Sequence, residues 1–96
     1  MQKGWVYEPV ISNYDALLFY NVMSNYTDGY HYHPIAIAKR EQIGMKYRFL
    51  CIVLEKITLN LPSHFADIEI YKPELGKPYA TCIYKLEFEQ FSSQRI

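Results

Sequence analysis

Alternating apolar and polar residues dominate the chain after Gly29 and continue almost to its end. Successive side chains of a strand point to opposite faces, so a two-residue period predicts strands that bury one face and expose the other. The clearest run is residues 46–55, in which one face carries Tyr47, Phe49, Cys51 and Val53. We predict four strands here, at residues 31–40, 46–55, 65–72 and 80–88.

The last two of these strands can also be assigned a buried and a solvated face. In residues 65–72 the apolar set is Ala66, Ile68 and Ile70, and the polar set is Asp67 and Glu69. Two carboxylates at i and i+2 of a strand are typical of a solvated face that discourages edge pairing. In residues 80–88 we expect the buried set to be Cys82, Tyr84, Leu86 and Phe88.

A helical period occurs only before Gly29. The stretch from Ser12 to Asp15 has the form of a helix start, with the acid near the positive end of the helix dipole. Apolar residues then recur with helical spacing, at Ala16, Phe19, Tyr20 and Met23. We predict a helix at residues 13–26, preceded by a short strand at residues 5–11 that Pro9 interrupts.

The connections between the predicted strands are short, which favours antiparallel neighbours because a parallel crossover needs about a dozen residues. Hydrophobic residues make up 50% of the 96 residues, enough for one small core without a metal or a disulfide. We therefore expect one α+β domain, residues 1–96, in which a four- to five-stranded antiparallel sheet wraps around one helix.

The charge balance bears on the class of partner. Ten basic and ten acidic side chains cancel, and no basic run is longer than Lys39-Arg40, so nucleic acid and anionic membranes are not expected partners. No apolar run reaches the ~18 residues of a membrane span. The first residues lack the apolar stretch of a signal peptide, which leaves open an exported protein whose leader has been removed. The ten tyrosines favour a protein-binding surface.

The residues that could carry chemistry do not form a convincing site. Cys51 and Cys82 lie on strands separated by a third, roughly 10 Å apart, so we expect two free, buried thiols. His31 and His33 share a strand face, but His64 lies on a non-adjacent strand, so no metal site is expected. We predict a protein that is not an enzyme and that needs no cofactor or metal.

Several short motifs, in this order along the chain, resemble cystatins, and the nearest likeness is to short bacterial cystatin-like domains. The likeness extends from Gly4 to about Phe88. The motifs are Gly4-Trp5, Tyr32-x-Pro34-x-Ala36, Gln42-Ile43-Gly44, Tyr47-x-Phe49-Leu50-Cys51 and Ile68-x-Ile70-Tyr71-Lys72.

The resemblance implies a cystatin-like fold and inhibition of papain-like cysteine proteases. In that family an N-terminal glycine segment and two hairpin loops form one wedge that enters the protease cleft. By position, these elements are Gly4 with Trp5, the bend from Glu41 to Met45, and the turn at residues 73–79. The residues implied to contact a protease or another protein partner are Gly4, Trp5, Glu41, Gln42, Ile43, Gly44, Pro78 and Tyr79.

The first bend departs from the Gln-x-Val-x-Gly pattern of cystatins. Aligned without a gap, Arg40 replaces the glutamine and Glu41-Gln42-Ile43 replaces small apolar residues, which places charge in the tip. Aligned on Gln42, the loop is two residues shorter and protrudes about 3 Å less. We therefore expect a cystatin-fold module that binds a protein, with protease inhibition as the alternative. We expect a monomer or a weak dimer, which could arise by domain swapping.

Overall fold

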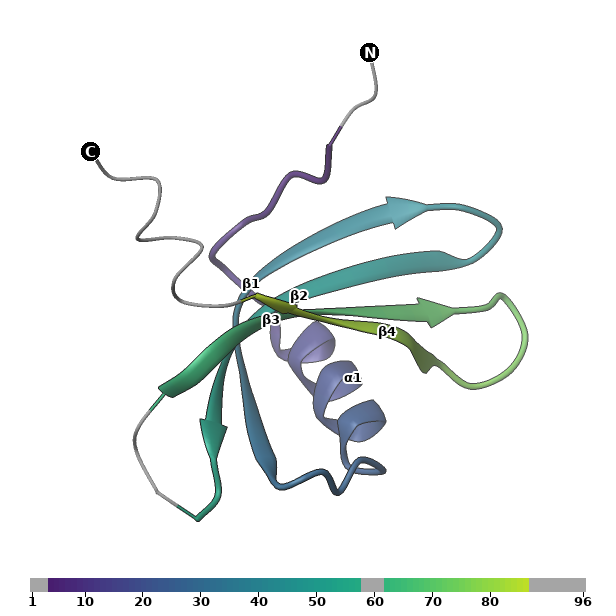
Figure 1. Ribbon diagram of the computed structural model, residues 1–96. Coiled ribbons are helices and arrows are strands. Elements are labelled where there is room, and N and C mark those ends of the chain that lie inside the picture. Colours follow the sequence, from purple (N-terminus) through teal and green to yellow (C-terminus); the bar gives the residue numbers. More distant parts are fainter. Residues whose placement is uncertain (1–3, 58–61, 87–96) are drawn as a thin grey trace.

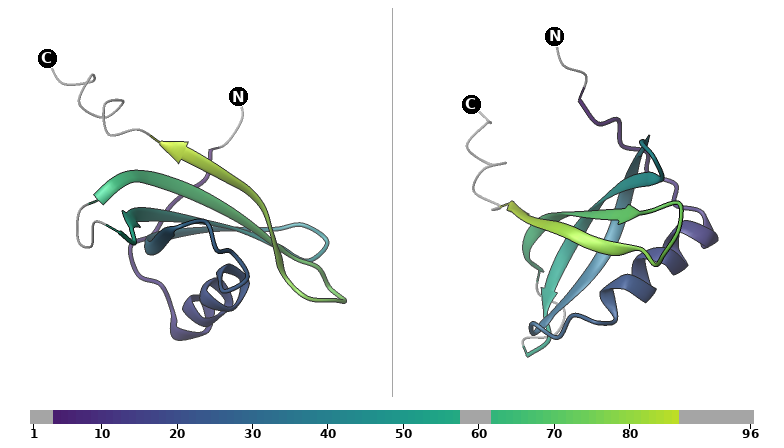
Figure 2. Two further views of the ribbon diagram at one scale, coloured as in Figure 1. Left: turned by 60° about the horizontal axis from the view of Figure 1, so that its bottom comes forward. Right: turned by 90° about the vertical axis from the view of Figure 1, so that its right-hand side faces the viewer.

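The computed structural model describes residues 4–57 and 62–86 (Figure 1). One helix precedes four strands that form an antiparallel sheet in the order β1-β2-β3-β4. The elements are α1 (Asn13–Met23), β1 (Tyr30–Glu41), β2 (Met45–Glu55), β3 (Pro62–Lys72) and β4 (Tyr79–Leu86). The sheet curves around α1, which lies against its inner face (Figure 2). The predicted α+β arrangement of four antiparallel strands and one helix is confirmed.

Helix α1 begins where the sequence predicts and ends three residues early. The Ser12 hydroxyl accepts a hydrogen bond from the Asp15 N–H at 3.1 Å, which caps the first turn. After Met23 the backbone tightens, because the Asn25 N–H donates to the carbonyl three residues before it. The predicted end at residue 26 is therefore wrong.

The strand predicted at residues 5–11 is also wrong. This segment pairs with β1 at one isolated bridge, where Glu8 and Ile37 exchange backbone hydrogen bonds of 2.8 and 2.9 Å. The pairing extends to neither side of this bridge, and Pro9, whose φ is fixed at about −65°, follows the bridge directly. The four strands predicted after Gly29 are present. The third, β3, begins at Pro62, three residues before its predicted start, and residues 87 and 88 of the fourth predicted strand lie outside the described residues.

The core lies between α1 and the inner face of the sheet. Phe19 and Phe49 are fully buried, and their ring centroids are 4.8 Å apart. The inner faces predicted for β2 and β3 are confirmed, because each predicted residue on them is buried. These residues are Tyr47, Phe49, Cys51 and Val53 of β2 and Ala66, Ile68 and Ile70 of β3.

The buried stripe of α1 is rotated from the predicted one. Phe19 and Met23 are buried as expected, but Tyr20 is 47% exposed, and Leu18 and Val22 point inward instead. The buried Asp15 carboxylate forms an ion pair with Lys39 of β1 at 2.7 Å, which fixes the first turn of the helix against the sheet.

The predicted buried face of β4 is wrong for each described residue, because the strand contains a β-bulge. Glu69 pairs with Cys82, whereas the next residue, Ile70, pairs with Ala80, so Thr81 is the extra residue. The one-residue shift turns Cys82, Tyr84 and Leu86 to the outer face of the sheet. Ile83 instead lies opposite Ile68 on the inner face.

Both cysteines are free, as predicted, because β3 separates the strand of Cys51 from that of Cys82. Cys51 is buried, and this burial raises the pKa of its thiol well above the usual range. Cys82 is half-buried rather than buried.

The packing of the β1–β2 hairpin against the β3–β4 hairpin requires a glycine at position 44. Its φ is +100°, and a Cβ atom there would lie 2.5 Å from the Lys72 carbonyl oxygen. We expect Gly44→Ala to lower the free energy of unfolding, measured by urea denaturation, by at least about 2 kcal/mol. Gly29→Ala is the matched control, because Gly29 has φ +87° but open space around it, and it should cost about 1 kcal/mol. Equal losses would contradict this packing.

Candidate functional site

The two hairpin loops project from the same end of the molecule (Figures 1 and 2). The first, residues 42–44, joins β1 to β2, and the second, residues 73–78, joins β3 to β4. The antiparallel register places them together, because Met45 at the start of β2 pairs with Lys72 at the end of β3. We call this part of the surface the hairpin end.

Direct contacts hold the two loops together. The Tyr71 hydroxyl of β3 donates a hydrogen bond to the Ile43 carbonyl of the first loop. Gly44 lies against the backbone of Lys72 and Pro73, with no room for a side chain between them. Within the first loop the Gln42 N–H donates to the Gly44 carbonyl at 3.1 Å. The hairpin end is therefore one packed unit rather than two independent loops.

Apolar side chains stand at both tips. Ile43 is 81% exposed and Leu75 is 91% exposed. A hollow of about 400 Å³ lies on the outer face between the hairpins, and Tyr71 and Tyr79 line it with their rings 5.9 Å apart. Exposed aliphatic tips beside an aromatic hollow can bury apolar area against a partner protein.

The predicted site residues are distributed unevenly over this end. Gln42, Ile43 and Gly44 form the first tip, and Tyr79 lies beside it in the hollow. Glu41 is exposed but belongs to the last pair of the β1–β2 ladder, opposite Met45, so it does not lead the tip. Pro78 is half-buried and lines a hollow beside α1 with Leu18 and Asn21.

The N-terminal segment reaches the outer face of the sheet near the first hairpin. The ring of Trp5 contacts two guanidinium groups, Arg40 at 4.4 Å and Arg48 at 4.7 Å from its centroid. Arg40 precedes Glu41, the last residue of β1, so this contact brings Trp5 close to the hairpin end. Gly4 is exposed.

Arg48 belongs to a charged network on the outer face. Its Nε donates to Glu69 at 3.0 Å, Lys46 lies 3.7 Å from the same carboxylate, and the Thr81 hydroxyl donates to it at 2.9 Å. Glu69 is only 7% exposed, so the expectation of a solvated carboxylate is wrong. Burial acts to raise the pKa of Glu69, but the hydrogen bonds from Thr81 and Arg48 and the two positive charges lower it on balance.

Asp67 is the second carboxylate of this face. One of its oxygens accepts a hydrogen bond from the Tyr7 hydroxyl, and the other, Oδ1, is buried without a hydrogen-bond partner among the described residues. Burial raises the pKa of Asp67, although Tyr7 and Arg48 oppose that rise. Tyr7 and Trp5 together fasten the N-terminal segment across the outer face.

Sequence reasoning missed this network. The signal was present in the sequence. Lys46 and Arg48 are two residues apart on one strand, and Asp67 and Glu69 are two residues apart on its neighbour, so each pair shares a face. Opposite charges on one face of paired strands attract each other. The position of Trp5 above them has no comparable pattern in the sequence.

His31 and His33 are exposed, whereas His64 is buried and its Nδ1 lies 2.9 Å from the Ser63 hydroxyl. Within residues 4–57 and 62–86, no group of three or more His, Cys, Asp or Glu residues is placed to hold a metal ion. No helix in the same ranges has the length and apolar character needed to cross a membrane. Comparison with protein-family models, with curated proteins and with solved structures finds no match for the chain.

We expect Tyr7→Phe to lower the free energy of unfolding by about 1–3 kcal/mol at pH 7, because it leaves an ionised, half-buried carboxylate without its donor. The substitution should also raise the pKa of Asp67 further. A carboxyl whose pKa is raised in the folded state stabilises that state when protonated, so the loss should shrink as the pH falls through the raised pKa. Urea unfolding of both proteins at pH 7 and pH 4.5 measures this difference, and a pH-independent loss would contradict it.

Proposed function

We propose that the chain is a non-enzymatic protein-binding module with a cystatin-like fold, and that its hairpin end contacts the partner. The observation that carries this proposal is the joint position of two exposed aliphatic tips, Ile43 and Leu75, on loops fastened to each other. Such a surface loses little conformational entropy on binding, because its backbone is already ordered by the contacts between the hairpins.

The chemistry of the hairpin end suits a partner with an apolar depression. Burying one fully exposed Ile or Leu side chain stabilises a complex by about 1.5–3 kcal/mol. Tyr79, which is 52% exposed, adds an aromatic contact with a polar hydroxyl. Glu41 and Lys46 lie behind the tip, where partly solvated charges favour orientation more than affinity.

The alternative function is inhibition of a papain-like cysteine protease, which the resemblance to cystatins implies. Ile43 rather than Glu41 leads the first tip, and this favours the alternative because a desolvated cleft accepts an apolar tip more readily than a carboxylate. The Trp5 contacts favour it too, since they hold the N-terminal segment near the same end. Inhibition of this kind acts by shape and burial and needs no nucleophile.

We expect the double variant Ile43→Ser/Leu75→Ser to weaken partner binding by at least tenfold while leaving the urea midpoint unchanged. Ile57→Ser is the matched control, because Ile57 is 93% exposed and follows β2, at the other end of that strand from the hairpin end. The immobilised chain and both variants would be exposed to extracts of the organism that encodes it. A partner retained by the tip variant would contradict the proposal.

Papain inhibition tests the alternative separately. The purified chain should inhibit papain, the Ile43→Ser/Leu75→Ser variant should inhibit it at least tenfold more weakly, and Ile57→Ser should behave like the unmodified chain. Absence of inhibition at 100-fold molar excess would reject protease inhibition and leave the binding proposal to the capture experiment.

A further inference from the structure

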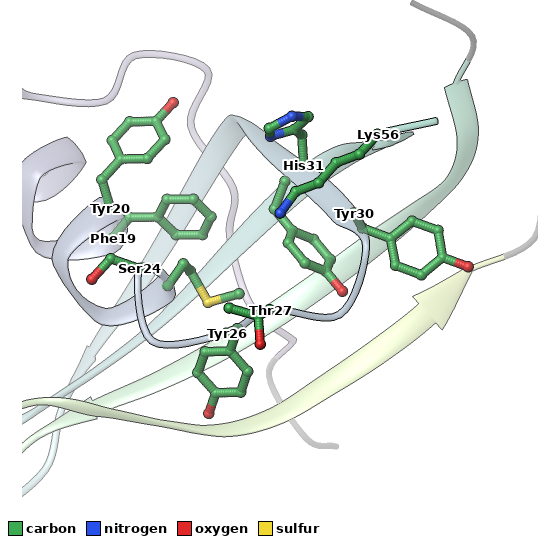
Figure 3. Close-up of a pocket in the computed structure, with 10 residues that line it drawn as sticks. Phe19, Tyr20, Ser24, Tyr26, Thr27, Tyr30, His31 and Lys56 are labelled. Carbon is green, nitrogen blue, oxygen red and sulfur yellow. The ribbon is translucent and has the colours of Figure 1, made fainter. Parts of the chain in front are cut away.

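A second concave surface lies far from the hairpin end, where the C-terminal end of α1 meets the start of β1. It is a hollow of about 370 Å³ (Figure 3), within the size range of small-ligand sites in proteins. Half of its ten lining residues are phenylalanine or tyrosine: Phe19, Tyr20, Tyr26, Tyr30 and Tyr32. Such walls suit a flat, apolar ring, which can stack or pack edge-on against them.

Contacts within the protein hold the walls of this hollow in place. Phe19 is fixed between Tyr20 and Phe49, at centroid distances of 5.3 and 4.8 Å. Tyr30 packs edge-on against the buried His64 ring at 5.3 Å, and the Tyr32 hydroxyl donates to Asp28. The site therefore exists before any ligand enters, which lowers the cost of binding.

One positive charge stands at the mouth. Lys56 is the only Lys, Arg, Asp or Glu among the lining residues, and Figure 3 shows its ammonium end directed toward Phe19. No salt bridge of Lys56 is found within residues 4–57 and 62–86. The Asp28 carboxylate, which contacts two wall residues, already accepts from the Tyr32 hydroxyl and from the Tyr30 N–H at 3.2 Å.

Thr27 and His31 add polar groups to the lining. Ser24 also lines the hollow, but its hydroxyl already donates to the Asn21 carbonyl at 2.8 Å. In Figure 3, Tyr26 and Tyr30 lie at the margins with their hydroxyls directed away from Phe19, so the centre keeps an apolar floor. An apolar floor below a cation and the Thr27 hydroxyl matches a ring that bears an anionic oxygen group.

We propose that this hollow binds a small ligand made of an aromatic ring and a carboxylate. The ring would pack against Phe19 and the tyrosines, and the carboxylate would pair with Lys56. Two sources share this chemistry: a free aromatic acid, and the C-terminal aromatic residue of a peptide. The site is independent of the hairpin end, because β1 and β2 each extend from one surface to the other.

The test is a titration of the isotope-labelled chain followed by two-dimensional NMR. Phenylacetate probes the free acid, acetyl-Ala-Ala-Phe probes the peptide terminus, and acetyl-Ala-Ala-Phe-amide lacks the carboxylate. Ligands of about ten heavy atoms at such sites bind with Kd values of about 1–10 mM. We expect the amide signals of residues 24–32 and 56 to shift with phenylacetate, with the peptide acid or with both.

Variants assign the charge and the position. Lys56→Met should weaken carboxylate binding roughly two- to fivefold, as expected for an exposed ion pair. Lys77→Met is the matched control, an exposed lysine in the second hairpin loop, and should leave the Kd unchanged. Thr27→Trp should abolish binding by filling the hollow, and a dispersed amide spectrum would show that this variant folds.

The outcomes are distinct. Binding of phenylacetate alone assigns a free aromatic acid, and tighter binding of the peptide acid assigns a chain terminus. Binding of the peptide acid and its amide with the same measurable Kd, shifts confined to residues outside the hollow, or no shifts with any probe at 20 mM would each overturn the proposal.

Discussion

The packing of Phe19 against Phe49 is the contact on which the rest of the structure depends. Both rings are fully buried, and they join the only helix among the described residues to the centre of the sheet. This contact commits one face of the sheet to the core. The outer face and the two ends of the sheet are then the surfaces available for other contacts. The hairpin end and the proposed ligand hollow lie at opposite ends of β1 and β2.

The outer face carries four charged side chains close together, Lys46, Arg48, Asp67 and Glu69. Glu69 is buried, and Arg48, Lys46 and Thr81 surround its carboxylate. A buried carboxylate destabilises the folded protein when its charged partners are removed. Trp5 lies on the guanidinium of Arg48, so the N-terminal segment shields the network from water. The network in turn holds this segment close to the hairpin end.

The sequence predicted the helix start, the four later strands and the inner faces of β2 and β3, because these depend on local capping and on a strict two-residue period. It failed for the first predicted strand, which pairs with β1 at one bridge only, and for β4, where the bulge at Thr81 turns Cys82 and Tyr84 outward. For the site, the resemblance implied the first bend, the turn at residues 73–79 and Trp5, whereas the contacts of Trp5 with Arg40 and Arg48 join segments distant in the sequence and could not be predicted from it.

The two hairpin loops are held together as one preformed surface. The decisive measurement is proton NMR of the free protein, through nuclear Overhauser effects between Gly44 and Pro73 and between the Tyr71 ring and Ile43. We expect strong effects for both pairs, because a Cβ atom at Gly44 would lie 3.1 Å from the Pro73 Cα and the Tyr71 hydroxyl donates a hydrogen bond to the Ile43 carbonyl. Absence of both effects in a folded sample would show that the loops move independently and would contradict the claim.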